Sequence, residues 1–205
     1  MSGESDLPLN ELTDEQLVTA YRNGRDSAFE ALVQRFHAEL LHFLVRFVGN
    51  RAAAEDLFQE AFLQVHLSAS TFDASKRFKP WLFTIAANKA RDYLRKNNRR
   101  EGKRVTLADA SDDKIRIIDL LEAELPLPAE TIEDAETQRL VRELVDALPD
   151  HLREVLLLAY FNQFSYKEIA SMLSIPLGTV KSRLHAAVGT FAELWKSRYS
   201  AEAKQ

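Results

Sequence analysis

The chain has 205 residues and a net charge of −4, and 46% of its residues are hydrophobic and 28% charged. This composition is typical of a soluble globular protein, and the lack of cysteine excludes disulfides, thiol nucleophiles and thiolate metal sites. The longest apolar run, at 155–161, is too short to cross a bilayer, and the acidic start of the chain has no signal-peptide pattern. We therefore expect a cytoplasmic protein with no membrane insertion.

The charges are strongly segregated along the chain. Residues 76–104 hold 11 basic and 2 acidic residues, a net charge of +9. Residues 105–136 hold 2 basic and 10 acidic residues, a net charge of −8. A single basic block in an acidic chain indicates one local contact with a polyanion rather than a general coating of nucleic acid.

Helical periodicity dominates the first hundred residues, and no run alternates as a strand does. Thr13 and Gln16 have the spacing of a capping box, which predicts the start of a short helix through residue 21. Longer apolar stripes at helical spacing follow at 29–47, at 54–65 and, opened by Pro80, at 80–94. A break at 68–75 separates the last two. Together these helices predict a bundle over about residues 10–100.

The pattern weakens from residue 101 to residue 130, where acidic residues accumulate and two prolines appear. This segment is predicted to be a flexible acidic linker. A second apolar stripe begins near residue 140, so residues 131–197 form a second helical domain. The predicted fold class is therefore all-α, with two small helical domains on an acidic tether.

The second domain contains a segment typical of a helix-turn-helix. Ser165 and Glu168 predict a capping box, and Pro176 is predicted to open the next helix. The buried stripe of that helix is expected at Val180, Leu184, Ala187 and Phe191. The opposite face then carries small or polar residues flanked by basic ones, suited to the DNA major groove: Gly178, Thr179, Lys181, Ser182 and Arg183. The alternative is a plain helical hairpin with solvated charges.

A polar stripe follows one face of the basic helix after Pro80. Its members are spaced four, three and four residues apart, at Thr84, Asn88, Arg91 and Arg95. Aromatic and basic residues precede it, at Phe72, Lys76, Arg77 and Trp81. Amide and guanidinium groups read base edges and phosphates, and aromatic rings stack on unpaired bases, so the region indicates a nucleic-acid surface. A solvated helix face with core aromatics remains the alternative.

The helix at 54–65 carries a second candidate surface. Its face opposite the apolar stripe holds Asp56, Gln59, Glu60 and Leu63, with Leu67 one turn further on. Leucines among acidic residues favour a partner-binding surface if they are exposed. Periodicity alone gives equal support to the alternative, in which both leucines complete the bundle core.

These segments resemble the bacterial RNA polymerase sigma factors of the extracytoplasmic-function (ECF) group. The resemblance covers about residues 15–195. It is carried by AEDLFQEAF at 54–62, FKPWLFTIAAN at 78–88, YKEIA at 166–170 and GTVKSRL at 178–184, with a weaker match around 148–155. Departures are few: Phe58 replaces a frequent polar residue, and Ala187 and Val188 replace basic residues after the recognition helix.

The resemblance implies a role for each candidate surface. Asp56, Gln59, Glu60 and Leu63 would dock core RNA polymerase. The loop at 68–75 and the helix with Asn88 would capture the non-template strand of the minus-ten promoter element. The helix with Arg183 would read the minus-thirty-five element as duplex DNA, and the linker would thread channels of the polymerase. An anti-sigma factor is a further partner that the resemblance leaves open.

Two other functions compete with this one. A helix-turn-helix transcriptional regulator that binds DNA as a dimer would explain the second domain, but not the polar stripe or the acidic linker. An enzyme acting on nucleic acid would need a catalytic constellation. The five histidines are scattered without metal-ligand spacing, and no phosphate-binding loop or nucleophile elbow is present. We therefore expect no enzyme activity, no metal and no cofactor.

Overall fold

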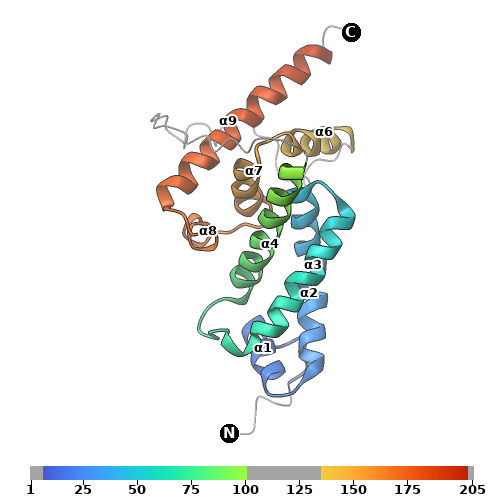
Figure 1. Ribbon diagram of the computed structural model, residues 1–205, viewed down its shortest axis with the longest axis vertical. Helices are drawn as coiled ribbons and strands as arrows, with labels where there is room; N and C mark the ends of the chain where they lie inside the picture. The colour runs from blue at the N-terminus through green and yellow to red at the C-terminus, as the bar shows by residue number, and fades with distance from the viewer. Residues whose placement is uncertain (1–6, 101–134, 203–205) are drawn as a thin grey trace. The chain divides into compact units, whose positions relative to one another are not determined.

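The computed structural model describes residues 7–100 and 135–202, and every regular element within them is a helix. The all-α prediction is confirmed. The chain divides into two compact units, residues 1–103 and 104–205, which are described separately (Figure 1). The linker expected at 101–130 lies outside the described residues.

The first unit is a helical bundle. Its described elements are α1 (Asp14–Arg22), α2 (Asp26–Val48), α3 (Arg51–Ser68), the short 3-10 helix η1 (Ala69–Thr71) and α4 (Phe78–Arg100). The long helix α2 contacts each of the other three α-helices (Figure 1). The break predicted at 68–75 is therefore present, but it begins with one turn of helix.

Local sequence signals set the ends of these helices. Thr13 caps α1, because its side chain accepts a hydrogen bond from the Gln16 amide. The side-chain oxygen of Gln16 in turn accepts from the Thr13 amide at 2.9 Å, which confirms the predicted capping box. Helix α2 ends at Gly49, whose φ of 68° is readily adopted only without a side chain. The Asn50 side chain then caps α3 by accepting from the Ala53 amide at 2.9 Å.

Phenylalanine rings fill the centre of this bundle. The rings of Phe36 and Phe78 lie 5.5 Å apart, and those of Phe43 and Phe83 lie 5.3 Å apart. All four side chains are buried. Burying one such ring stabilises the fold by about 1.5–3 kcal/mol, so these contacts fix α4 against α2.

Helix α4 begins at Phe78, two residues before the predicted start at Pro80. Pro80 is tolerated there because the first turn of a helix has no internal partner for its amides. The buried face consists of Leu82, Phe83, Ala86, Ala87 and Ala90. Ile85 and Tyr93, within the predicted apolar stripe at 80–94, are only half-buried.

The second unit is also helical. Its described elements are α6 (Ala135–Asp146), α7 (Asp150–Leu156), the π-helical turn η3 (Leu157–Phe161), α8 (Tyr166–Leu173) and α9 (Leu177–Glu202). The core lies between α7 and α9, and α8 packs on α9. Every residue of the predicted α9 stripe, from Val180 to Phe191, is buried.

Helices α8 and α9 form the predicted helix-turn-helix. Ser165 and Glu168 make the capping box that opens α8. Helix α8 ends at Ser174, which has φ 54°, and the turn closes as the Ile175 amide donates to the Ala170 carbonyl at 3.1 Å. The prediction for Pro176 was off by one residue. Helix α9 begins at Leu177, and Pro176 precedes it while its carbonyl accepts from the Val180 amide.

Candidate nucleic-acid interface

The segment between η1 and α4, residues 72–77, forms a short exposed loop, called here the 72–77 loop. Its turn is held by Asp73, whose carboxylate accepts from the amide of Ser75 at 3.0 Å and from its hydroxyl at 2.7 Å. Hydrogen bonds from the Ser75 side chain and amide lower the pKa of Asp73, and Lys76 adds to this effect. The loop therefore has a defined turn with an ionised carboxylate at neutral pH.

Two aromatic residues predicted to meet DNA, Phe72 at the start of the loop and Trp81 in α4, pack against each other. Phe72 is only 5% exposed, and its ring lies 4.9 Å from Trp81 and 5.8 Å from Phe78. The prediction that Phe72 is available to a base is wrong for this conformation, since its ring belongs to the core. Trp81 is half-buried, so one part of its ring packs in this cluster and another part is accessible.

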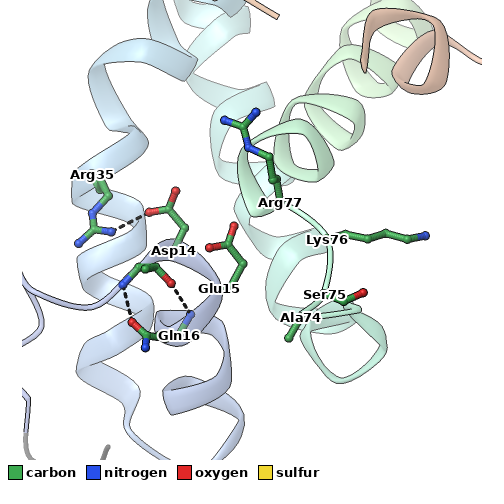
Figure 2. A pocket seen from close by; sticks show the side chains of 9 residues that line it. Asp14, Glu15, Gln16, Arg35, Ala74, Ser75, Lys76 and Arg77 are labelled. Carbon is green, nitrogen blue, oxygen red and sulfur yellow. Dashed lines mark hydrogen bonds and ion pairs between the residues drawn. The ribbon is translucent and has the colours of Figure 1, made fainter. Parts of the chain in front are cut away.

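The basic residues of the loop are exposed. Lys76 and Arg77 are both accessible to solvent, and Figure 2 shows the Lys76 side chain extending away from α1. A pocket of about 690 Å³ separates the loop from the start of α1 and from Arg35 of α2. Two carboxylates of α1 line it, and one of them, Asp14, pairs with Arg35 at 2.7 Å.

The polar stripe of α4 is partly exposed. Asn88 and Arg95 are exposed, whereas Thr84 and Arg91 are half-buried. The Thr84 hydroxyl donates to the Pro80 carbonyl within the helix at 2.7 Å, so its hydrogen is already used. Arg91 donates to the Asn88 side chain, which holds these two groups together on the surface. Asn88 and Arg95 thus form the exposed part of the stripe, and the half-buried Arg91 lies beside Asn88.

The outer face of α3 combines acidic and apolar residues. Asp56, Gln59 and Glu60 are exposed, and Leu63 and Leu67 are 58% and 65% exposed. The alternative that these leucines complete the core of the bundle is therefore wrong for this unit. Glu60 also pairs with Lys89 of α4 at 3.1 Å, so the α3 face continues toward the basic helix.

In the second unit, the start of α9 presents the predicted reading face. Gly178, Lys181 and Ser182 are exposed, while Thr179 and Arg183 are half-buried. Burial, followed by the nearby Arg183 guanidinium, lowers the pKa of His151 in α7, and Asp150 acts in the opposite direction. Arg183 is thus near enough to α7 to act on His151, and its own side chain is half-buried.

Two contacts from α1 were not anticipated from the sequence. The Glu15 carboxylate accepts from the amide of Phe78 at 2.8 Å, and the Arg22 guanidinium donates to the carbonyl of Phe72 at 3.3 Å. Periodicity could not indicate them, because the partners lie 63 and 50 residues away and the bonds go to backbone atoms. These contacts place α1 beside both ends of the 72–77 loop.

Within residues 7–100 and 135–202, no group of three or more histidine, aspartate or glutamate side chains is placed to hold a metal ion. In the same ranges, no helix has the length and apolar character that a membrane span requires. The candidate site is thus a set of surfaces: the α3 face, the 72–77 loop with the α4 stripe, and the start of α9.

Comparisons with known proteins agree with this arrangement. Residues 32–100 match the model of Sigma-70 region 2, and residues 138–190 match that of Sigma-70, region 4. The chain is 32% identical to the RNA polymerase sigma-H factor of Pseudomonas aeruginosa, over 87% of this chain and 92% of that protein. It is 36% identical to the sigma factor CarQ of Myxococcus xanthus, over 85% and 92%.

Solved structures show the same fold. The structure of CnrH with the cytosolic domain of CnrY has a TM-score of 0.64 at 22% identity, covering 90% of this chain and 97% of that one. The sigma factor RpoE of Bartonella quintana, bound to the anti-sigma factor NepR, has a TM-score of 0.61 at 23% identity, covering 82% and 96%. The ECF RNA polymerase sigma-E factor of Haemophilus influenzae is 31% identical, over 86% of this chain and 92% of that protein. Because the family models match both units in order and this relative is matched over nearly its full length, the chain belongs to the ECF group of RNA polymerase sigma factors, which bind core polymerase and direct it to promoters.

Proposed function

We propose that this sigma factor docks core RNA polymerase through the α3 face made by Asp56, Gln59, Glu60 and Leu63. The exposure of Leu63, at 58%, is the observation that carries this assignment. Large apolar side chains ringed by charged groups are typical of protein interfaces, because the apolar centre gains from burial and the charged rim gives orientation. The neighbouring Leu67 extends the apolar centre by one turn.

The 72–77 loop and the α4 stripe are assigned to the minus-ten element. Lys76 and Arg77 would neutralise the phosphates of the displaced strand, and Asn88 and Arg91 would contact base edges next to them. Trp81 would offer its accessible edge to an unstacked base, and Thr84 and Arg95 would extend the contact along the helix. The buried ring of Phe72 anchors the start of the loop in the core. These assignments are favoured by the exposure of Lys76, Arg77 and Asn88 and by the burial of the Phe72 ring.

The start of α9 is assigned to the minus-thirty-five element. Exposed Gly178 and Ser182 allow close approach to the major groove, and Thr179, Lys181 and Arg183 would contact phosphates or bases. Residues 101–130 would connect the two DNA-binding domains, at 10–100 and 131–197, through polymerase channels that otherwise hold nucleic acid. The protein would act in the cytoplasm, where promoters are, and phosphodiester chemistry would belong to the polymerase.

A double substitution on α3 tests the docking assignment. Asp56→Ala with Gln59→Ala should weaken binding to core polymerase at least tenfold, because it removes a charge and an amide from a desolvated surface. The matched control is Glu30→Ala with Gln34→Ala, which removes the same two groups from the exposed face of α2. Affinity is measured by fluorescence anisotropy with labelled protein. Equal affinity of the test and control variants would contradict the assignment.

A further inference from the structure

We propose that α1 is a brace that holds the 72–77 loop at both ends and so positions it for strand capture. This inference rests on the minus-ten role proposed for that loop. Helix α1 would not itself contact the promoter DNA. Its two contributing side chains, Glu15 and Arg22, are thus positioning residues.

The two contacts span the loop. Arg22, in the last turn of α1, donates to the carbonyl of Phe72, where the loop begins. Glu15, in the first turn, accepts from the amide of Phe78, directly after the loop ends. The two residues are seven positions apart, which corresponds to about 10 Å along a helix. One rigid helix therefore fixes the distance between the two ends of the loop.

The Glu15 contact also completes the start of α4. The amide of Phe78 belongs to the first turn of α4 and has no acceptor within the helix. A carboxylate at that position satisfies the amide and interacts favourably with the positive end of the helix dipole. Burial acts to raise the pKa of Glu15, but hydrogen bonds from the Phe78 amide, its own amide and Thr13, together with nearby Arg77, lower it overall. Glu15 is therefore ionised at neutral pH.

The brace is anchored on α2 and is independent of the α3 face. Leu17 and Val18 of α1 are buried, and Arg35 of α2 donates to the Leu12 carbonyl at 3.0 Å and pairs with Asp14. Figure 2 shows Glu15 on the side of α1 that faces the segment with Arg77, across the pocket from Arg35. Loss of the brace should consequently affect the loop and leave polymerase docking intact.

The exposed middle of the loop depends on its two ends for its position. From Ala74 to Arg77 its residues are exposed, and hydrogen bonds from Ser75 and from the Lys76 amide to Asp73 hold its turn. Phe72 and Phe78 bury its two ends, but apolar contacts are not directional and leave the backbone free to shift. Hydrogen bonds to the Phe72 carbonyl and the Phe78 amide fix the backbone itself.

The test uses holoenzyme assembled with core polymerase and Glu15→Ala, Glu15→Gln, Arg22→Ala or Thr19→Ala. Binding of a fluorescent single-stranded minus-ten oligonucleotide and permanganate reactivity of promoter thymines report strand capture. Core affinity and melting temperature are measured beside them. Thr19→Ala is the control, because Thr19 is exposed on α1 and bonds only within that helix, to the Glu15 carbonyl.

Glu15→Ala and Arg22→Ala should each weaken strand binding about fivefold, the effect of losing one intramolecular hydrogen bond. Glu15→Gln keeps an acceptor oxygen and should stay near the unmodified protein, as should Thr19→Ala. Core affinity should be unchanged in all four. If Glu15→Ala also lowers the melting temperature, the strand binding of Arg22→Ala decides whether the brace is correct. The Arg22 side chain is exposed, so its removal leaves no cavity.

Asn88→Ala separates failure of the brace from failure of the proposed function. If Asn88→Ala weakens strand binding while Glu15→Ala and Arg22→Ala do not, the brace is wrong and the minus-ten assignment stands. If Asn88→Ala also has no effect, the minus-ten assignment fails and the brace fails with it. A parallel loss of core affinity in the α1 variants would likewise overturn the brace, because it would indicate general damage to the bundle.

Discussion

Arg183 is the residue whose role depends most on its surroundings. Its guanidinium can bind guanine or phosphate with two parallel hydrogen bonds, but the side chain is half-buried and lies near His151. A partly fixed arginine loses less conformational freedom on binding than a fully exposed one. This favours a base contact for Arg183 and a phosphate contact for the exposed Lys181.

Arg183→Ala should therefore cost about 1–3 kcal/mol on the cognate minus-thirty-five element and much less on an element mutated at the contacted base. Lys181→Ala should weaken binding equally on both elements and reduce the salt dependence. Holoenzyme binding to matched and mismatched promoters at several salt concentrations measures both. Equal losses for Arg183→Ala on the two elements would make it a phosphate contact.

His151 gives the second unit a predicted dependence on pH. Its pKa is lowered in the folded state, so the unfolded chain takes up a proton at a higher pH than the folded chain does. The stabilisation of the second unit by neutral His151 is fully present above the ordinary histidine pKa of about 6.5. It should be lost as the pH falls through the lowered pKa of His151 in the folded state. Hydrogen exchange of amides in α7 and α9 of the full chain, measured at about pH 7.5 and about pH 5.5, should show weaker protection at the lower pH.

His151→Gln is the control for that measurement. It keeps a polar side chain at the half-buried position and removes the titrating group. The loss of protection at low pH should be smaller in this variant. An identical loss in both proteins would show that other groups cause it.

At the scale of elements, the turn between α8 and α9 contains a serine in a backbone conformation that is energetically unfavourable for residues with a side chain. Ser174 has φ 54°, in the left-handed region that favours glycine. Ser174→Gly should stabilise the protein by about 0.5–1 kcal/mol, because the relief of strain exceeds the added entropy of the unfolded chain. Urea denaturation measures the change.

Ser171 offers a matched control three residues earlier. It is exposed within α8, where the backbone is helical. Ser171→Gly should destabilise by about 0.5 kcal/mol because glycine is a poorer helix former than serine. The two substitutions exchange the same atoms, so the same sign at both positions would contradict the explanation from backbone conformation.

The sequence predicted those elements whose signals are local. The capping boxes at Thr13 and Ser165 and the apolar stripe of α9 depend on residues within a few turns of one another, and the structure has all of them. Periodicity could not separate exposure from burial for Leu63, which is exposed, or for Phe72, which is buried. That distinction depends on which helix packs above each face.

The early start of α4 and the bracing contacts of α1 were missed for a related reason. The amide of Phe78 is satisfied by Glu15, 63 residues away, and no local pattern shows that an acceptor will be there. Long-range bonds to backbone atoms leave no residue-type signal at the backbone end. The candidate surfaces could thus be predicted from sequence, whereas the support that positions the loop required the structure.

Considering the whole molecule, charge and architecture agree with a polymerase subunit. The basic block at 76–104 holds the α4 stripe and the basic residues of the 72–77 loop, while the segment at 105–136 has a net charge of −8. Both units carry a DNA-directed candidate surface, and the first also has two exposed leucines among acidic residues on α3. A dimeric regulator that ignores polymerase would not need that α3 face.

Run-off transcription tests the central claim most directly. Purified core polymerase is combined with this protein on a library of promoter fragments, and transcripts are sequenced. We predict transcripts from a restricted set of promoters that share two elements, only when the protein is present, and fewer transcripts with Asp56→Ala and Gln59→Ala at limiting core. A protein that forms a stable dimer, binds DNA without polymerase and adds no promoter-specific transcript would contradict the account.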